Sequence, residues 1–240
     1  MKRLSLFIFI AALLSVYSLA KAQDTLYLDD NYKKISPKRA VFTKVVTNTD
    51  SSFLVKLYKR GSLVSIQTFK DEALKIQHGP ATSYYENGNI DSEGSYKDKK
   101  RTGHWTFYYD NQKIASMVKF HEGKVLHAVY YNEEGNVELP SNQSDVMPVF
   151  QGDLKNYLKE NLRYPHQSSR NRISGIVKVA FTISRTGKVV DARVTSGVND
   201  ELDAEALQVI RKMPDWQPGR QFNRPVNVRY VLPIAFALNK

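Results

Sequence analysis

The sequence contains no cysteine among its 240 residues. This absence excludes disulfide bridges, cysteine nucleophiles and thiolate-bound metal ions. It also excludes a lipid-modified N-terminal cysteine, so we expect that the mature protein is not a lipoprotein. The composition is otherwise ordinary, with 42% hydrophobic and 25% charged residues, which is typical of globular domains.

Long apolar runs are also scarce, and the one that stands out is the uncharged stretch of 17 residues at 4–20. Basic residues precede it, and Ala20 and Ala22 supply small residues at the positions read by signal peptidase. This pattern predicts a secretory signal peptide over 1–22, with Gln23 as the first mature residue. The alternative is an uncleaved inner-membrane anchor, for which 17 residues are near the lower limit. Both interpretations place the rest of the chain in the periplasm or cell envelope.

The formal net charge is +11 at pH 7, but no dense run of one sign is present. Proteins that bind nucleic acid usually gather Lys and Arg on one face or along one segment. Here the basic residues are scattered among acidic ones. The charge therefore indicates solubility and weak attraction to an anionic envelope, and we expect no nucleic-acid binding.

The residue types of common catalytic sites are thinly spread. The sequence shows no nucleophile motif, no phosphate-binding loop and no metal-like spacing of histidine. We therefore predict that the protein is not an enzyme, that it holds no cofactor or metal, and that all its histidines lie at the surface, at turns or strand ends. The histidines are His78, His104, His121, His127 and His166.

An aromatic pair followed by a turn recurs in the first part of the chain, at intervals of 24 and 22 residues between Tyr85, Tyr109 and Tyr131. Glycine and asparagine in these turns accept positive φ, so each unit predicts strand, turn, strand, turn. Stacked hairpins bury an apolar face that one hairpin cannot bury alone. The pattern predicts an all-β hairpin-repeat domain over 23–138, in which 23–52 forms leading strands or a cap. The copies are Tyr84-Tyr85-Glu86-Asn87-Gly88, Tyr108-Tyr109-Asp110-Asn111-Gln112 and Tyr130-Tyr131-Asn132-Glu133-Glu134-Gly135.

These units resemble MORN-type repeats with aromatic-x-Asn-Gly turns, over roughly 53–138. One copy departs from that pattern, because Gln112 stands where the turn glycine is expected. The recurring Tyr84, Tyr108 and Tyr130 predict a packed core stripe, with a sugar- or peptide-binding ladder as the alternative. A polar segment at 139–148 predicts a linker to the next domain.

Residues 149–240 alternate between helical and strand periodicity. Apolar residues at helical spacing predict helices over 153–162 and 201–213. Strict alternation predicts a strand hairpin that begins at Gly175 and turns at 185–188. The order predicts an α+β fold: a small antiparallel sheet with two helices on one face.

The last element of this region is a long alternating run from Val226 to Leu238, which predicts one strand of about 13 residues. Pro233 lies inside this run. Proline has no backbone N–H to donate, so a strand that contains it normally lies at the edge of a sheet. An exposed edge can accept a further strand, from a partner or from a second copy of the chain.

The ordered set of motifs in this region resembles the C-terminal domain of TonB energy transducers. The matching residues are Tyr164-Pro165, Gly175-x-Val177-x-Val179-x-Phe181-x-Ile183, Gly187-x-Val189, Leu202-Asp203-x-Glu205-Ala206, Met213-Pro214-x-Trp216-x-Pro218-Gly219, Pro225-Val226 and Pro233-Ile234-x-Phe236. One departure is the turn before the last strand, where Phe222-Asn223 replaces the usual Asn-Gly. Asn223 can adopt the positive φ that such a turn requires.

The resemblance implies that the last strand binds a short peptide, the TonB box of an outer-membrane TonB-dependent transporter, by β-strand addition. The resemblance also implies that Arg224 and Arg229 pair with acidic residues of the partner. The implied peptide-binding residues are Arg224, Val226, Asn227, Val228, Arg229, Tyr230 and Val231.

A full energy transducer of this family also implies an anchoring helix that engages an inner-membrane proton-driven motor, and a proline-rich rod. The apolar run at 4–20 contains no histidine, and the nine prolines are spread along the chain. Two hypotheses therefore stay open. The first is a TonB-like protein that supports energised transmembrane transport. The second is a non-energising periplasmic adaptor or assembly protein, which uses the same edge for another client or for cell-wall binding. Strand exchange at that edge also predicts a possible homodimer.

Overall fold

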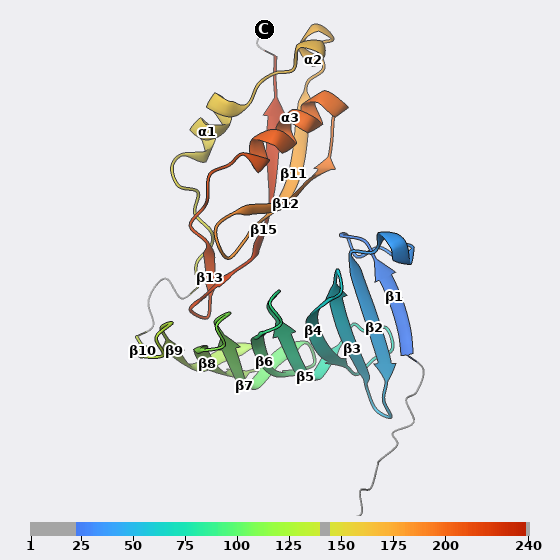
Figure 1. Cartoon of the computed structure of the whole chain (residues 1–240), viewed down its shortest axis with the longest axis vertical. Coiled ribbons are helices and arrows are strands. Elements are labelled where there is room, and N and C mark those ends of the chain that lie inside the picture. The colour runs from blue at the N-terminus through green and yellow to red at the C-terminus, as the bar shows by residue number, and fades with distance from the viewer. Residues whose placement is uncertain (1–22, 140–144, 239–240) are drawn as a thin grey trace, which may run out of the picture.

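The computed structural model describes residues 23–139 and 145–238 (Figure 1). The predicted signal peptide or anchor at 1–22 and residues 140–144 of the predicted linker lie outside these residues. Within them, no helix combines the length and apolar character needed to cross a membrane.

The first region is a single antiparallel sheet of ten strands that pair in chain order, and we call it the repeat sheet. The segment 23–52, expected to form leading strands or a cap, supplies two leading strands of this same sheet. The strands are β1 (Gln23–Leu28), β2 (Phe42–Asn48), β3 (Phe53–Lys59), β4 (Ser62–Phe69), β5 (Gln77–Tyr84), β6 (Ile90–Lys97), β7 (Lys100–Tyr108), β8 (Ile114–His121), β9 (Lys124–Tyr131) and β10 (Val137–Glu138), with a short 3-10 turn at Pro37–Arg39.

The recurring turns of the repeat sheet share one geometry. Gly88, Gln112 and Gly135 occupy equivalent positions with φ of 86°, 69° and 95°. Gln112 therefore adopts the conformation that glycine adopts in the other two copies, at a steric cost that glycine avoids. Its side-chain amide donates to Asn89 Oδ1 of the preceding turn at 2.6 Å.

The tyrosines of the repeats connect neighbouring units. The Tyr85 hydroxyl donates to the carbonyl oxygen of Tyr108 at 2.5 Å, and the Tyr109 hydroxyl donates to that of Tyr131 at 2.8 Å. Tyr130 is buried, as the core interpretation of the stripe predicts, whereas Tyr84 and Tyr108 are half-buried. The most deeply buried tyrosines of the first two copies are Tyr85 and Tyr109, the second member of each pair.

The second region, 149–238, is the C-terminal domain, with a three-stranded antiparallel sheet in the order β12-β11-β15. The predicted small sheet with helices is therefore present. Its elements are α1 (Leu154–Asn161), α2 (His166–Arg170), β11 (Gly175–Ile183), β12 (Val189–Ser196), α3 (Asp200–Arg211), β13 (Gly219–Gln221), β14 (Arg224–Val226) and β15 (Val228–Phe236).

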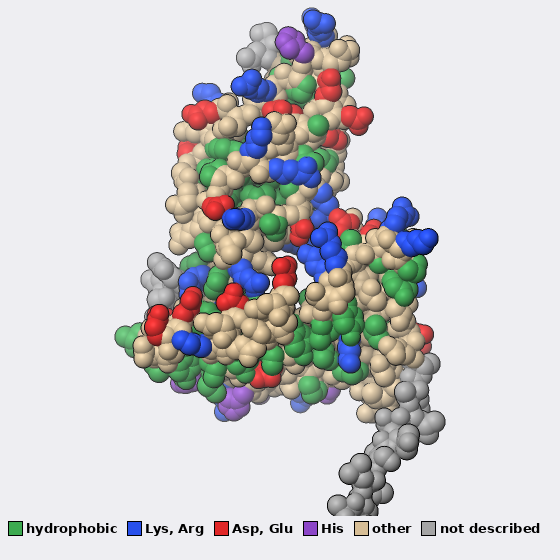
Figure 2. Space-filling view, in the orientation of Figure 1, with side chains coloured by type: hydrophobic (Ala, Val, Ile, Leu, Met, Phe, Trp, Pro, Cys, Tyr) green, Lys and Arg blue, Asp and Glu red, His purple; other side chains and the backbone are tan. Residues whose placement is uncertain are grey.

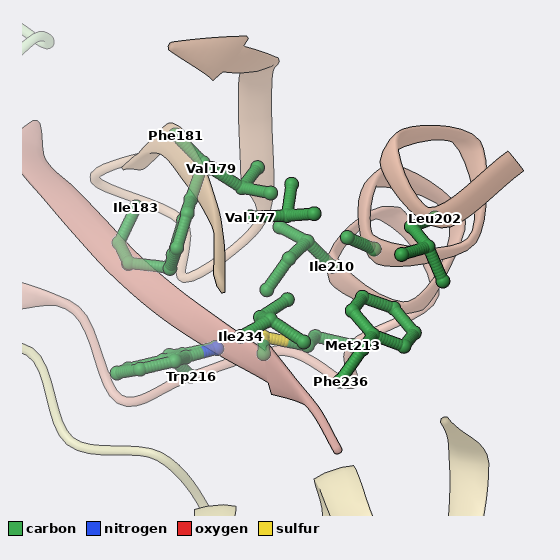
Figure 3. Packing of buried hydrophobic residues seen from close by; sticks show 11 residues of the cluster. Val177, Val179, Phe181, Ile183, Leu202, Ile210, Met213, Trp216, Ile234 and Phe236 are labelled. Atoms are coloured by element: carbon green, nitrogen blue, oxygen red, sulfur yellow. The ribbon is translucent and has the colours of Figure 1, made fainter. Parts of the chain in front are cut away.

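The core of this domain lies between β11, β15 and α3 (Figure 3). Val177, Val179 and Ile183 of β11 are fully buried, because the period of two in a strand places them all on the helix-facing side. Leu202 and Ile210 of α3 meet them and are equally buried. The Asn199 side chain caps α3 by accepting a hydrogen bond from the backbone N–H of Leu202 at 2.9 Å.

One expectation for this region is wrong in detail, and one helix was not expected. The run from Val226 to Leu238 is not one strand, because the chain leaves the β13–β14 hairpin at Asn227 and only then begins β15. The Asn227 side-chain oxygen accepts from the Arg185 backbone N–H at 2.9 Å, which fixes this break. The helix α2 was not predicted, since its five residues are too few to show helical periodicity.

The C-terminal domain stands over one face of the repeat sheet, with its β13–β14 hairpin directed at that face (Figure 1). A second contact joins the start of the repeat sheet to β12. Lys59 lies 3.5 Å from Asp191, and Arg193 lies 3.4 Å from Asp30. These ion pairs are partly exposed and contribute little stability, so the hairpin is the principal connection.

Candidate functional site

The free edge of the C-terminal sheet is the first feature of interest. β15 pairs with β11 from Val228↔Ile183 to Phe236↔Gly175. Among the described residues, no strand pairs with its other side. A strand in this position presents unpaired backbone N–H and C=O groups in a regular row. β15 therefore lies at the edge of the sheet, as its Pro233 predicted.

The two faces of β15 differ. Tyr230 points into the domain, where its ring centroid lies 5.5 Å from that of Trp216 and 5.8 Å from that of Phe181. Arg229 and Val231 point outward, and Val231 is 60% exposed. Side chains that a bound strand could meet on the outer face thus come from Arg229 and Val231, while Tyr230 holds the strand in place.

The β13–β14 hairpin is the second feature. Its turn residues Phe222 and Asn223 have φ of 50° and 64°, so Asn223 adopts the positive φ that was expected. Phenylalanine is unusual in this conformation because its side chain crowds the backbone. Burial of the Phe222 ring stabilises this turn. The ring stacks on Phe107 of the repeat sheet at 4.3 Å between centroids, and Phe222 is 7% exposed.

Polar contacts hold the hairpin turn on the repeat sheet. The Ser116 hydroxyl donates to the Phe222 carbonyl oxygen at 3.0 Å. The Asn223 side-chain amide donates to the Tyr131 carbonyl oxygen at 3.0 Å and to Glu138 Oε2 at 2.7 Å. Because buried polar groups are costly when unpaired, these bonds specify one seating of the turn.

Arg224 completes the contact. Its guanidinium makes a two-pronged ion pair with Asp91, with Nη1 2.8 Å from Oδ1 and Nη2 3.2 Å from Oδ2. Its side chain is only 7% exposed. Two-pronged pairs of this kind are directional and strong. The acidic residue that Arg224 meets in this structure therefore belongs to the same chain.

The predicted peptide-binding residues thus fall into two groups. Val228, Arg229, Tyr230 and Val231 lie together on β15, along the free edge. The others precede that edge: Arg224 and Val226 belong to β14, which pairs with β13, and Asn227 forms the break between the two strands. The role of Phe222 and Asn223 was missed, because a turn residue shows no periodicity that would reveal its burial.

Tyr85 and Tyr108 of the repeat sheet have a raised pKa. Burial raises the pKa of the Tyr85 hydroxyl, against the opposing effect of the nearby Arg224. Burial and the hydrogen bond to Glu93 raise the pKa of Tyr108 to about 12. Both tyrosines are therefore neutral at physiological pH and act as hydrogen-bond donors.

The histidines occupy exposed positions, as expected. His104 and His127 lie within β7 and β9, and His166 begins α2, so the expectation that all five would fall at turns or strand ends is wrong for these three. In the described part of the chain, no group of three or more histidine, aspartate or glutamate side chains is arranged to hold a metal ion.

Comparison with known proteins finds a family match for each of the two regions. Residues 160–238 match the family model of the Gram-negative bacterial TonB protein C-terminal, and residues 77–98, which span β5 and β6, match a MORN repeat variant. Protein TonB of Pseudomonas putida is 28% identical over 104 residues, a segment that covers 42% of this chain and 42% of that protein.

Two solution structures of the Helicobacter pylori TonB-CTD are also similar, each with 27% sequence identity. The longer covers 38% of this chain and 82% of its own, with a TM-score of 0.31, and the shorter covers 36% and 91%, with a TM-score of 0.29. On the two family models, the chain carries a TonB-type C-terminal domain that follows a sheet with a MORN-like repeat.

Proposed function

We propose that the chain is a TonB-like cell-envelope protein that captures a peptide segment of an outer-membrane transporter by strand addition at β15, and so supports energised transport. The observation that carries this proposal is the free edge of β15 in a domain of the TonB type. In strand addition, backbone hydrogen bonds supply affinity and alternate side chains supply selectivity.

The position of Pro233 indicates which residues of β15 offer their N–H groups to a partner. Proline is tolerated in a paired strand where its nitrogen faces away from the neighbour. Pro233 pairs opposite Lys178 of β11, so its nitrogen faces the free edge. The direction of the backbone N–H alternates from one residue to the next along a strand, so the N–H groups of Val231 and Arg229 also face the free edge. Their N–H groups are the donors that an added peptide would use.

Arg224, Val226 and Asn227 have a different role in the proposal. They lie in the hairpin and the break that precede β15, so they fix where the free edge begins. A peptide bound along β15 would end beside them, where an acidic residue of the peptide would meet Arg224 in competition with Asp91.

The test is binding of a synthetic TonB-box peptide to the full chain, followed by NMR or calorimetry. Val231→Pro removes one outward N–H without touching the pairing with β11 and should weaken binding about fivefold to tenfold. Val231→Thr keeps the N–H and serves as the matched control. Unchanged binding by a folded Val231→Pro variant would exclude strand addition at this edge.

The second candidate is a non-energising periplasmic adaptor that uses the same edge for another client or for the cell wall. The observation that favours it is the direct seating of the C-terminal domain on the repeat sheet, through Phe222 and Arg224. The N-terminal residue of the protein from envelope fractions separates the two. A chain that begins at Gln23 supports the adaptor, whereas a retained segment in inner-membrane vesicles supports an anchored transducer coupled to a proton-driven motor.

A further inference from the structure

A cleft of about 780 Å³ lies between the repeat sheet and the lower end of the C-terminal domain. Figure 2 shows the opening between the two regions, with basic side chains around it. The repeat sheet supplies one wall, including Tyr85 and Arg101, and the C-terminal domain supplies the other, including Arg185 and Arg224. The cleft therefore exists only because the hairpin is seated on the sheet.

The charged residues that line the cleft are mainly basic. Lys59, Arg60, Arg101, Arg185 and Arg224 contribute positive charge, whereas the acidic side chains are those of Glu86 and Asp91. Asp91 is already occupied, since it pairs with Arg224 and accepts a hydrogen bond from the Ser83 hydroxyl at 2.8 Å. Lys59 is paired with Asp191. Within the described residues, no carboxylate lies within 4.0 Å of the Arg60, Arg101 or Arg185 guanidinium.

Aromatic rings hold two of these guanidinium groups. The Arg185 Cζ atom lies 4.5 Å from the centroid of the Tyr85 ring, and the Arg101 Cζ atom lies 4.9 Å from that of Trp105. Stacking on a ring orients a guanidinium but leaves the N–H groups at its edge available. These groups are therefore preorganised donors that face a cavity.

Arg224, which also lines the cleft, has a hydrogen-bond donor without an acceptor. Its Nε atom is buried and has no acceptor among the described residues, although its terminal nitrogens bind Asp91. A buried donor without an acceptor is costly, so an acceptor that enters the cleft would stabilise this group. This atom lies in a residue that is 6% exposed and lines the cleft.

We propose that this cleft binds an acidic peptide, with its carboxylate held by Arg185, Arg101 and Arg60. Guanidinium groups match carboxylates with paired, charge-assisted hydrogen bonds. The remaining lining combines hydroxyl and amide groups, such as those of Thr82 and Gln67, with apolar side chains. That combination fits the peptide bonds and side chains of an extended segment. The site adjoins the start of β15 at Val226 and Asn227 but does not include Arg229 or Val231.

The probe is the acetylated and amidated tetrapeptide Tyr-Glu-Tyr-Glu, titrated calorimetrically into the full chain. Its matched control is the analogue in which both glutamates are glutamine. We expect the acidic peptide to bind at least tenfold more tightly than the analogue, and its affinity to fall as NaCl rises from 50 to 300 mM, because mobile ions screen the arginines.

Arg185→Gln is the decisive variant, since its side chain contacts Tyr85 at the surface of the cleft and its backbone bond to Asn227 is retained. It should lower affinity for the acidic peptide about tenfold. Arg170→Gln, an exposed change in α2 at the far end of the domain, should leave affinity unchanged.

Equal binding of the acidic and glutamine peptides would overturn the proposal. Tighter binding of free glucuronate than of the acidic peptide would also overturn it, in favour of a sugar-acid site. A loss of affinity in Arg170→Gln as large as that in Arg185→Gln would show that attraction is non-specific. A thermal melt of each variant separates loss of binding from loss of folding.

Discussion

The two regions of this molecule build their cores differently. The C-terminal domain has two layers, so Val177 and Ile183 of the sheet are covered by α3 of the same domain. The repeat sheet is a single layer, and its largest fully buried side chains, Phe107 and Val118, lie in the cluster that includes Phe222 of the other region. A single sheet cannot bury one face alone, so this one is completed by a hairpin from elsewhere in the chain.

The two regions therefore have separate sources of stability. The C-terminal domain depends on packing between its own helix and strands. The repeat sheet depends on strand pairing, on the tyrosine hydrogen bonds between units, and on the seating of Phe222. Changes at equivalent-looking glycines and aromatics should therefore have unequal effects in the two regions.

The largest expected effect is that of Phe222→Ala. Removal of a buried phenylalanine ring typically costs about 3–5 kcal/mol, and here it uncovers Phe107 and Phe120 of the repeat sheet. Hydrogen exchange should become faster in β5–β9 while the core of β11 and α3 stays protected. Phe236→Ala, within the C-terminal core, is the matched control and should show the opposite pattern. Equal loss of protection in both regions after either change would refute the separation.

A smaller effect is expected for Gly94→Ala in β6. A Cβ atom at this position would lie 2.3 Å from the Trp105 ring, so the indole must shift from its place in the core. Overpacking of this kind costs about 1–3 kcal/mol in the free energy of unfolding, measured by denaturant titration. Gly175→Ala in β11 is the comparison, because its new Cβ meets the side-chain tip of Val198, a partly exposed residue. A larger cost at Gly175 would contradict the contrast.

The smallest effect is expected for Gln112→Gly. Glycine at this φ of 69° removes the steric cost of the left-handed conformation but loses the hydrogen bond to Asn89, so we expect a gain of about 0.5 kcal/mol. Gly88→Ala, at the equivalent turn of the previous unit, should destabilise by about 1 kcal/mol. Thermal denaturation of both variants measures these two changes in stability. Changes of the same sign would show that the two turns are not equivalent.

Much of the fold follows from periodicity in the sequence. The alternation of Val177, Val179 and Phe181 identifies both a strand and its buried face, and the helical spacing of apolar residues over 201–213 identifies α3. Pro233 identified the edge strand by a local property, the missing N–H. The turn glycines identified the hairpins of the repeat sheet for the same kind of reason.

The contacts between the regions were not predictable in this way. Periodicity shows that a face is buried but not what buries it, so the contact of Phe107 with Phe222 could not be predicted. Phe222 occupies a turn, where an aromatic residue would ordinarily be exposed, and Arg224 has its acid far away in the sequence, at Asp91. The break at Asn227 also depends on a distant group, the Arg185 backbone.

The seating of the hairpin also determines the order in which the molecule is assembled. All ten strands of the repeat sheet pair with neighbours in the sequence, so the sheet can form from local contacts. The bond from Ser116 to Phe222 spans 106 residues, so the contact that covers Phe107 must close a much longer loop. A chain in which the sheet has formed therefore carries an uncovered aromatic face until the hairpin docks. That face is the surface a chaperone would recognise during biogenesis.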